Sequence, residues 1–388
     1  MKAIVYNGCD LLDSCSAKKL LANKKLGLLT NMSGLTKDLK LASVELSHKY
    51  NLCALFGPEH GIYGTNQAGG FDKEQFIDPD TGAPVFDLFG GDGKIPASTE
   101  SAFSSIEALV VNIQDIGVRY YTYQFAMLDC MKLCAKYNVE VIVLDRINPL
   151  GGKNVFGNRI EKECLSYVGN VESQPAVYGM TIGELALWFN SHLNIGASVS
   201  VLRCEGWKRD MWFDDTDLLF VPPSPNMSSL ETAILYPGTC FFEGTNLSEG
   251  RGTTKPFEMF GAPWLEPQKL IDFLDSLPSV AKEAMNGLVF RKCSYTPIFS
   301  KHKGEVCHGL QLHIRDRNSI DMYAVGLYLV YAVRNLYPDK FEFTRTMPLL
   351  TGTKKSIDEE FDPFEYVSGQ KSKLEEFITE RNPFLLYD

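Results

Sequence analysis

The clearest indication of the fold lies in residues 106–144, IEALVVNIQDIGVRYYTYQFAMLDCMKLCAKYNVEVIVL. An apolar run over Ile106–Ile113 predicts a buried strand, and helical spacing over Tyr121–Lys136 predicts a helix. Val139–Leu144 then predicts a second buried strand. Two buried strands joined by one helix are typical of a βαβ unit in a parallel sheet.

The same alternation extends toward the N-terminus of the chain. Lys25–Thr30 and Leu52–Phe56 predict strands, and Leu39–Lys49, which lies between them, has helical spacing. Val199–Arg203 predicts one more strand. The first half of the chain is therefore expected to be an α/β domain with a parallel sheet.

The second half has a different character. Residues 221–264 are rich in Pro, Gly, Ser, Thr and Asn and show no period, which is typical of a functional segment without regular structure. The pattern that follows predicts a smaller α+β domain, with three helices and two strands over Glu266–Leu274, Val280–Asn286, Leu288–Lys292, Leu310–Ile314 and Met322–Leu336.

Composition narrows the class of protein. The 388 residues carry a formal charge of −10, which argues against nucleic-acid binding, and their apolar runs are too short to span a membrane. The ten cysteines are scattered without a CxxC motif, and the first ten residues lack the apolar core of a signal peptide. We expect a cytoplasmic protein, or a periplasmic or secreted one if a leader was trimmed; the oligomeric state stays open.

Polar clusters follow four of the predicted strands, at Asn31–Gly34, Gly57–Gly64, Gln114–Tyr123 and Asp145–Pro149. Any one cluster could be turn chemistry, because Asn, Asp and Gly are common turn residues. Ligands of open parallel sheets bind beyond the carboxyl ends of the strands, however. Four successive clusters therefore predict a binding site at that edge.

Familiar cofactor motifs are missing. The chain has no G-x-G-x-x-G after its first strand, no P-loop, no G-x-S-x-G and no H-E-x-x-H. We therefore expect no cofactor and no metal, and the missing glycine motif counts against a nicotinamide-dependent sugar dehydrogenase.

Carboxylates remain as candidates for the chemistry. Glu59 leaves a buried strand in a loop, where partial desolvation would suit a general acid, although a salt bridge or a helix cap is the alternative. Glu243, Glu249 and Glu258 lie in the aperiodic segment, where glycines beside Glu249 would let the backbone approach a ligand. Glu184 is better explained by a capping box with Thr181.

Cations and aromatic residues occupy the same predicted loops. Arg119, Arg146 and Arg251, with Lys255 nearby, would favour an anionic group on the substrate. Tyr120, Tyr121 and Tyr123 could offer flat faces to a sugar ring, or could be the buried start of the following helix.

These motifs together resemble the exo-β-N-acetylmuramidases of the NamZ type, long described as a domain of unknown function. The resemblance covers nearly the whole chain and is carried by Leu28–Asn31, Leu55–Gly61, Gln114–Tyr123, Asp145–Gly152, Gly179–Ala186, Pro223–Asn226, Tyr236–Glu258 and Arg381–Tyr387. The chain departs from the family pattern at Ile147, where proline is usual, at Phe156, where glutamate is frequent, and at Tyr178, where histidine is common.

The resemblance implies a Rossmann-like catalytic domain and a smaller C-terminal domain that completes the cleft. With the boundary that the sequence pattern indicates, these domains span residues 1–254 and 255–388. The resemblance implies no nucleotide. The implied activity is release of terminal N-acetylmuramic acid from the non-reducing end of peptidoglycan fragments, with the cations binding the lactyl carboxylate of the sugar.

Glycoside hydrolysis requires protonation of the leaving oxygen and stabilisation of an oxocarbenium-like transition state. We expect Glu59 to be the general acid and Glu249 the second carboxylate, with Glu243 or Asp115 as alternatives. A carboxyl separation of about 5–5.5 Å would indicate a retaining mechanism and about 6.5–9.5 Å an inverting one. The acetamide of the substrate is a further possible nucleophile.

The remaining polar residues of these motifs are expected to bind substrate, namely Asn31, His60, Gln114, Arg119, Tyr120, Tyr123, Arg146, Asn226, Asn246, Ser248, Arg251 and Thr253. The alternative from another class is a muropeptide or sugar-acid binding protein that uses the same cleft without hydrolysis.

Overall fold

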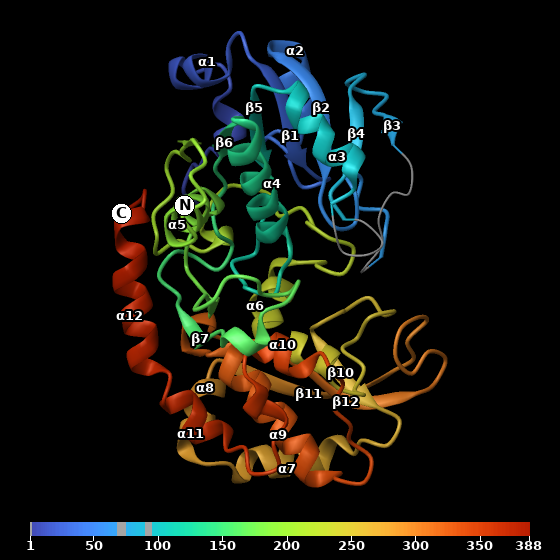
Figure 1. The fold of residues 1–388 in the computed structure, drawn as a ribbon. Coiled ribbons are helices and arrows are strands. Elements are labelled where there is room, and N and C mark those ends of the chain that lie inside the picture. The colour runs from blue at the N-terminus through green and yellow to red at the C-terminus, as the bar shows by residue number, and fades with distance from the viewer. Residues whose placement is uncertain (1, 68–74, 90–94) are drawn as a thin grey trace.

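A seven-stranded sheet forms the centre of the first part of the chain (Figure 1). The structure, a computed structural model, describes residues 2–67, 75–89 and 95–388. All neighbouring strands are parallel except the first pair, and the strand order is β3 (Phe76–Ile77), β4 (Pro84–Asp87), β2 (Asn51–Gly57), β1 (Lys25–Thr30), β5 (Ala108–Asn112), β6 (Glu140–Leu144) and β9 (Val199–Leu202).

Helices cover both faces of this sheet, which explains why its strands are apolar on both sides. Within β5, Leu109 and Val111 face one core and Ala108 and Val110 face the other. The first core includes residues of α4 (Tyr123–Tyr137) and α5 (Ile182–His192), and the second includes residues of α1 (Cys15–Leu21) and α2 (Ala42–Lys49). The predicted α/β class and parallel sheet are confirmed.

The smaller C-terminal part contains an antiparallel sheet of β10 (Met259–Ala262), β12 (Cys307–Ile314) and β11 (Leu288–Tyr295), in that order. Its helices are α6 (Leu230–Thr239), α7 (Pro267–Ser276), α8 (Ser279–Met285), α9 (Met322–Leu336), α10 (Met347–Thr351) and α11 (Pro363–Ser368). The outer helix α12 (Lys371–Arg381) runs back beside the first part, so that both termini lie there (Figure 1). The remaining elements, α3 (Ala97–Ala102), β7 (Phe156–Arg159) and β8 (Pro175–Val177), precede this part in the chain.

The expectation that residues 221–264 lack regular structure is wrong in part. Helix α6 and strand β10 lie within this range, and a short 3₁₀ helix over Cys240–Gly244 follows α6. Ser229 caps α6 by accepting a hydrogen bond from the Thr232 amide, whereas Pro237 and Gly238 near its end hide the helical pattern. Gly238 is needed because α6 crosses α9 closely: a Cβ on Gly238 would lie 2.1 Å from the Met322 carbonyl oxygen.

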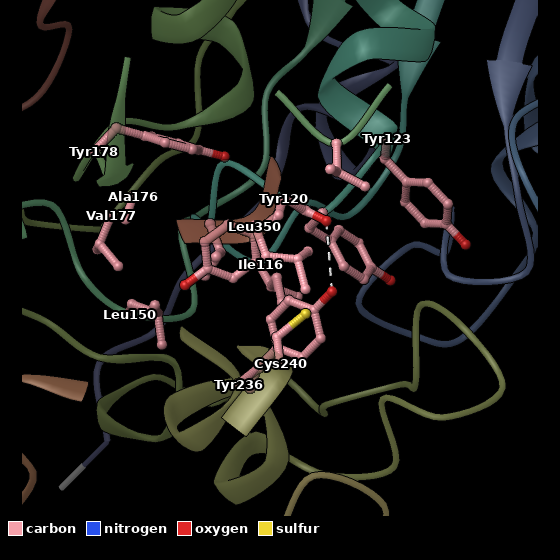
Figure 2. Packing of buried hydrophobic residues seen from close by; sticks show 14 of the residues in the cluster. Ile116, Tyr120, Tyr123, Leu150, Ala176, Val177, Tyr178, Tyr236, Cys240 and Leu350 are labelled. Atoms are coloured by element: carbon pink, nitrogen blue, oxygen red, sulfur yellow. Dashed lines mark hydrogen bonds between the residues drawn. The ribbon is translucent and has the colours of Figure 1, made fainter. Parts of the chain in front are cut away.

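One continuous core joins the two parts. Tyr120 and Tyr123 come from the loop and helix after β5, whereas Tyr236, Cys240 and Leu350 come from α6, the 3₁₀ helix and α10 (Figure 2). All five residues are buried in the same cluster. The predicted division at residues 254 and 255 stays a prediction. No helix within the described ranges is both long and apolar enough to cross a membrane.

Candidate active site

A polar pocket of about 390 Å³ lies where segments from both parts of the chain meet. Glu243, Glu249 and Arg251 come from the 3₁₀ helix and the loop after it, and Phe299, Ser300 and Lys301 come from the connection between β11 and β12. Gln67 adds a residue from the loop that follows β2. The pocket therefore combines segments more than 230 positions apart in the sequence.

Opposite charges in this pocket hold one another in place. Arg251 donates from Nε and Nη2 to Glu243 Oε1 at 2.9 and 2.7 Å, and its Nε lies 3.4 Å from Glu249 Oε1. Burial disfavours the guanidinium charge, but Glu243 and then Glu249 outweigh that effect and raise the pKa of Arg251. The Lys301 ammonium lies 2.8 Å from Glu249 Oε2.

The two carboxylates differ in access. The side chain of Glu249 is only 2% exposed and lies between Arg251 and Lys301, whereas that of Glu243 is 28% exposed. Glu243 is therefore the carboxylate of this pair that can contact a substrate directly, and Glu249 fixes the two cations.

The glycines of this loop serve chain packing. Gly250 and Gly252 both have φ +79°, and a Cβ on Gly252 would lie 2.7 Å from the backbone N and O of Phe299. A Cβ on Gly250 would lie 2.8 Å from the Lys255 carbonyl oxygen. These glycines therefore permit close approach to protein backbone, and the expected close approach to a ligand stays a prediction.

Glu59 lies half-buried in the loop after β2. Its Oε2 accepts a hydrogen bond of 2.7 Å from Oγ1 of Thr122, the residue before α4. His60 adopts φ +75°, and its Nδ1 lies 2.8 Å from the Asn66 carbonyl oxygen, which folds the loop back on itself. The loop thereby brings Gln67 to the pocket wall, where Asn226 Nδ2 donates to Gln67 Oε1 at 3.2 Å.

Tyr167 and Gln67 link Glu59 to the pocket. Partial burial raises the pKa of the Tyr167 phenol, and the negative charges of Glu243 and then Glu59 raise it further. The geometric link is Gln67, which belongs to the same loop as Glu59 and lines the pocket with Glu243 and Glu249. The loop after β2 and the 243–251 loop face the same region.

Asp115 is not among the residues that line this pocket. Its Oδ1 accepts hydrogen bonds from Tyr178 Oη and, at 2.6 Å, from the Gly117 amide. No described residue donates to its buried Oδ2. Burial raises the pKa of Asp115 to about 7, because Tyr178 and the Gly117 amide compensate only part of the desolvation.

The structure does not gather the three expected arginines in one cleft. Arg119 is fully buried and donates to the carbonyl oxygens of Asn158, Gln174 and Leu350 at 2.9, 3.0 and 3.2 Å. Arg146 is also buried, and it donates to the Leu35 carbonyl oxygen at 2.9 Å. Among the three, only Arg251 lines the pocket.

The hydrogen bonds of Arg146 include one of 3.0 Å to Gln114 Oε1, and Gln114 Nε2 in turn donates to the Ile147 carbonyl oxygen at 3.1 Å. Asn31 and Tyr123 both donate to the Pro223 carbonyl oxygen, at 2.9 and 2.7 Å. These strand-end residues therefore hold neighbouring loops together.

The other predicted substrate-binding residues also contact backbone. Tyr120 Oη donates to the Pro237 carbonyl oxygen, and Asn246 Nδ2 donates to that of Lys340 at 2.8 Å. Ser248 Oγ accepts from the Gly250 amide at 3.2 Å, and Thr253 Oγ1 donates to the Gly250 carbonyl oxygen at 2.6 Å. These contacts fix the backbone of the segments that carry them.

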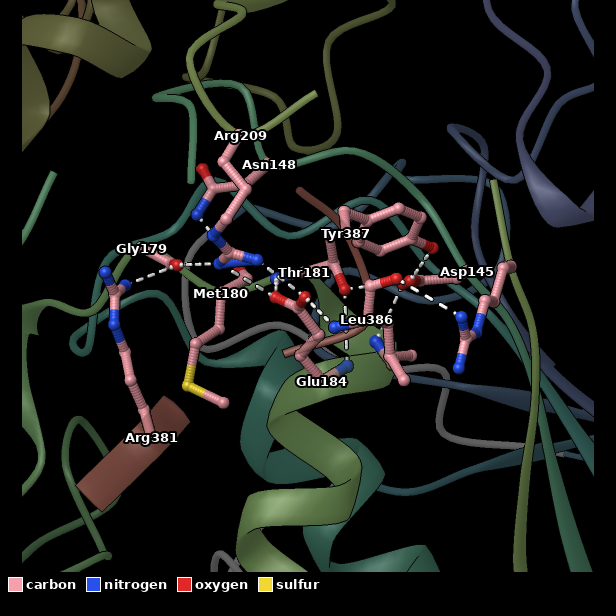
Figure 3. A network of polar contacts seen from close by, with 12 residues as sticks. Asp145, Asn148, Gly179, Met180, Thr181, Glu184, Arg209, Arg381, Leu386 and Tyr387 are labelled. Carbon is pink, nitrogen blue, oxygen red and sulfur yellow. Dashed lines mark hydrogen bonds and ion pairs between the residues drawn. The ribbon is translucent and has the colours of Figure 1, made fainter. Parts of the chain in front are cut away.

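The Asp145 cluster and Glu184 belong to a buried network (Figure 3). Thr181 and Glu184 form the predicted capping box of α5, and Arg209 pairs with Glu184 at 2.7 Å. Asp145 accepts from Thr181 Oγ1 at 2.8 Å and from Tyr387 Oη near the C-terminus. The network anchors the end of the chain to the sheet.

The structure also shows roles for Glu258, Lys301 and Gln67 that the sequence did not indicate. Glu258 accepts from Ser229 and Thr232 hydroxyls at 3.0 and 2.7 Å, beside the start of α6. Lys301 and Gln67 line the pocket, yet neither belongs to a motif, and no periodicity or spacing in the sequence distinguishes them from other loop residues.

A two-part α/β protein with neighbouring carboxylates in a pocket at the junction of its parts has the groups that hydrolysis of a glycosidic bond requires. The class that fold and site together define is that of the glycoside hydrolases.

Comparison with known proteins specifies the family. Profiles of the N-terminal and C-terminal regions of the exo-β-N-acetylmuramidase NamZ match residues 26–231 and 234–387. The chain belongs to the NamZ family. A relative from Bacillus subtilis (strain 168), the peptidoglycan β-N-acetylmuramidase NamZ, is 40% identical over 394 residues, covering 100% of this chain and 92% of its own length.

Two crystal structures of DUF1343 family proteins from Bacteroides fragilis NCTC 9343 share the fold. One has a TM-score of 0.87 and 32% identity, and the other a TM-score of 0.77 and 30% identity. Each comparison covers 99% of both chains. The family resemblance of the sequence motifs is thus confirmed over the whole chain.

Proposed function

We propose that this protein is an exo-acting glycoside hydrolase that releases terminal N-acetylmuramic acid from the non-reducing end of peptidoglycan fragments. The observation that carries this proposal is full-length membership of the NamZ family, together with the 40% identity to a β-N-acetylmuramidase. The substrate partner is a glycan fragment derived from peptidoglycan.

Glu59 is the general acid in this proposal. Its hydrogen bond with Thr122 Oγ1 fixes one carboxyl oxygen, and it lies half-buried in the loop that also brings Gln67 to the pocket. In this role it protonates the glycosidic oxygen as the bond to the leaving sugar breaks.

Glu243 is the second carboxylate in this proposal. It is the more exposed member of the pair on Arg251, so its oxygens can reach a sugar ring or the acetamide of the substrate. Glu249 then holds Arg251 and Lys301 in place. This assignment reverses the order expected from the sequence, where Glu249 stood first, because burial separates the two residues.

The test compares Glu59→Gln with Glu283→Gln, a control at an exposed residue of α8. Loss of a general acid lowers turnover by about 10²- to 10⁴-fold. We expect a smaller loss on an aryl β-N-acetylmuraminide than on a disaccharide, because an activated aryl leaving group needs less protonation. Glu283→Gln should match the wild type on both substrates.

Equal losses of Glu59→Gln on both substrates, with an unchanged melting temperature, would remove Glu59 from the general-acid role. No hydrolysis by the wild-type protein, combined with saturable binding of N-acetylmuramic acid, would instead identify a sugar-acid binding protein.

The proposed compartment is the cytoplasm, where the enzyme would act on imported fragments. All ten cysteines are free and seven of them are buried, which fits a reducing environment. Fractionation of the native producing cells with an antibody against the protein tests this proposal.

A further inference from the structure

The proposed substrate carries a carboxylate on its lactyl ether, and the cations first expected to bind it are already engaged. Arg119 donates to three carbonyl oxygens inside the protein, and Arg251 is paired with Glu243 and Glu249. Lys301 binds Glu249 and also donates to the carbonyl oxygens of Phe242 and Thr245 at 2.6 and 3.0 Å. A different cation is therefore needed to neutralise an incoming carboxylate.

Arg345 lies beside this pocket. The segment that carries it runs along residues 244–246, because the Thr344 amide donates to the Gly244 carbonyl oxygen at 2.9 Å and Phe343 bridges Thr245. This pairing places Arg345 next to Glu243. Arg345 is exposed, and it forms no ion pair with any described residue.

The turn that carries Tyr167 packs against the same part of the chain. Its Gly169 lies beside Arg119, which donates to the Leu350 carbonyl oxygen of α10, and the start of α10 packs closely against Gly244. Tyr167 stands at the tip of this tight turn, in which the Ser166 and Gly169 amides donate to each other's carbonyl oxygens, at 2.9 and 3.0 Å. The turn has a rigid base, because a Cβ on Gly169 would lie 2.8 Å from Ile160 and 3.4 Å from the Arg119 side chain. Tyr167 is nevertheless 61% exposed.

The charges around Tyr167 agree with this placement. After burial, the largest influences on its phenol are the negative charges of Glu243 and Glu59, which raise its pKa, whereas the positive charge of Arg345 lowers it. These influences agree with a position of the Tyr167 ring near Glu243, Glu59 and Arg345. An aromatic ring held on a rigid turn offers a flat apolar face to a sugar.

We propose that Arg345 and Tyr167 form the subsite that selects the lactyl substituent of the terminal sugar. Arg345 binds the lactyl carboxylate through charge-assisted hydrogen bonds, and Tyr167 packs against the sugar ring that carries it. This inference rests on the proposed function and assigns its specificity to two residues outside the family motifs quoted above.

The experiment uses three aryl β-glycosides: the N-acetylmuraminide, its lactyl carboxamide and the N-acetylglucosaminide, which lacks the lactyl ether. The carboxamide removes the negative charge but keeps the shape. Arg345→Gln should lower kcat/KM for the muraminide by about 10- to 100-fold, the range expected for a hydrogen bond to a charged group. On the carboxamide its kcat/KM should stay within about threefold of the wild type.

Lys303→Gln is the matched control, because Lys303 is an exposed cation in the neighbouring loop and the substitution changes the net charge equally. It should preserve the preference for acid over carboxamide. Arg345→Lys keeps the charge and should recover part of the activity. Tyr167→Ala should raise KM for the acid and the carboxamide alike by about 2- to 10-fold, and Tyr167→Phe should remain near the wild type.

Equal effects of Arg345→Gln on acid and carboxamide, or equal effects of Lys303→Gln and Arg345→Gln, would overturn the assignment of Arg345. If the wild-type protein hydrolyses none of the three glycosides, the proposed function fails. Calorimetric titration with free N-acetylmuramic acid then tests the subsite separately: Arg345→Gln should weaken binding about 10-fold or more, and unchanged binding would overturn the subsite.

Discussion

The buried pair of Glu184 and Arg209 permits a quantitative prediction. Their side chains are 0% and 8% exposed, and Arg209 contacts both carboxyl oxygens at 2.7 and 3.1 Å. Arg209 also donates to the Gly179 carbonyl oxygen at 2.7 Å (Figure 3). Arg209→Met removes one partner and leaves the other charge buried, so it should lower the free energy of unfolding by about 3–5 kcal/mol.

This loss converts into a change of melting temperature. Unfolding entropy of about 2.1 cal/mol/K per residue amounts to about 0.8 kcal/mol/K for 388 residues that unfold together. The melting temperature of Arg209→Met should therefore fall by about 4–6 °C.

The loss should also depend on pH. Burial raises the pKa of Glu184, and the charge of Arg209 opposes that rise. Without Arg209 the pKa of Glu184 in the folded variant rises further above its value in the unfolded chain. The folded variant then holds a proton that the unfolded chain releases, so its stability falls as pH rises through this interval. Arg209→Met should cost less at pH 5 than at pH 8.

Urea unfolding of the wild type, Arg209→Met, Glu184→Gln and the double variant at both pH values measures these effects. Arg317→Met is the control, since Arg317 pairs with the more exposed Asp214 and its loss should cost less than about 1 kcal/mol. A cost below 1 kcal/mol for Arg209→Met at both pH values would refute the reasoning. Loss of turnover by Glu184→Gln at unchanged stability would show that Glu184 acts chemically.

Two further perturbations test the surroundings of the site. The pKa of Asp115 is raised to about 7, so the folded protein binds a proton that the unfolded chain releases. The stability of Asp115→Asn relative to the wild type, measured by urea unfolding, should therefore increase by about 3 kcal/mol between pH 4.5 and pH 7.5. A stability difference that does not change with pH would contradict this. Gly252→Ala should be less stable in thermal unfolding than Gly304→Ala and should have a lower kcat/KM. Both glycines have positive φ, but only a Cβ on Gly252 would meet backbone atoms, those of Phe299 at 2.7 Å. Equal stability and equal kcat/KM of the two variants would show that this close contact is not needed.

Elements with strong apolar patterns were predictable to the residue. The predicted strand Lys25–Thr30 and helix Met322–Leu336 coincide with β1 and α9. Most residues of both elements are buried and therefore apolar, and their spacing follows the period of a strand or a helix. The βαβ unit over residues 106–144 was predictable for the same reason.

Helix α6 was not predictable from its pattern. Its last turn contains Pro237 and Gly238, residues that disfavour helices, and local propensity there is overridden by packing against α9. The close contact between Gly238 and Gly326 joins positions 88 apart. Nothing within ten residues of α6 announces that contact, so the sequence pattern indicated irregular structure.

The candidate site was predictable in its carboxylates more than in its cations. Loop carboxylates are costly to bury without partners, so Glu59, Glu243 and Glu249 stood out where polar residues follow buried strands or lie among glycines. Whether an arginine faces a ligand or the protein depends on which carbonyl oxygens surround it. Those around Arg119 come from residues 39 to 231 positions away.

The fate of these cations explains how an acidic chain can select an anionic sugar. Every positive charge that lines the pocket is paired with a carboxylate, and those pairs keep Arg251 and Lys301 fixed in a loop that has little regular structure. A substrate carboxylate would meet cations whose charge is already balanced by carboxylates there. A cation outside the paired cluster but next to Glu243 avoids this competition. Arg345 has this position and forms no ion pair with any residue that the structure describes. Specificity and catalysis would then rest on different cations, so that a change at Arg345 alters the choice of substrate without disturbing the carboxylates that act on the glycosidic bond.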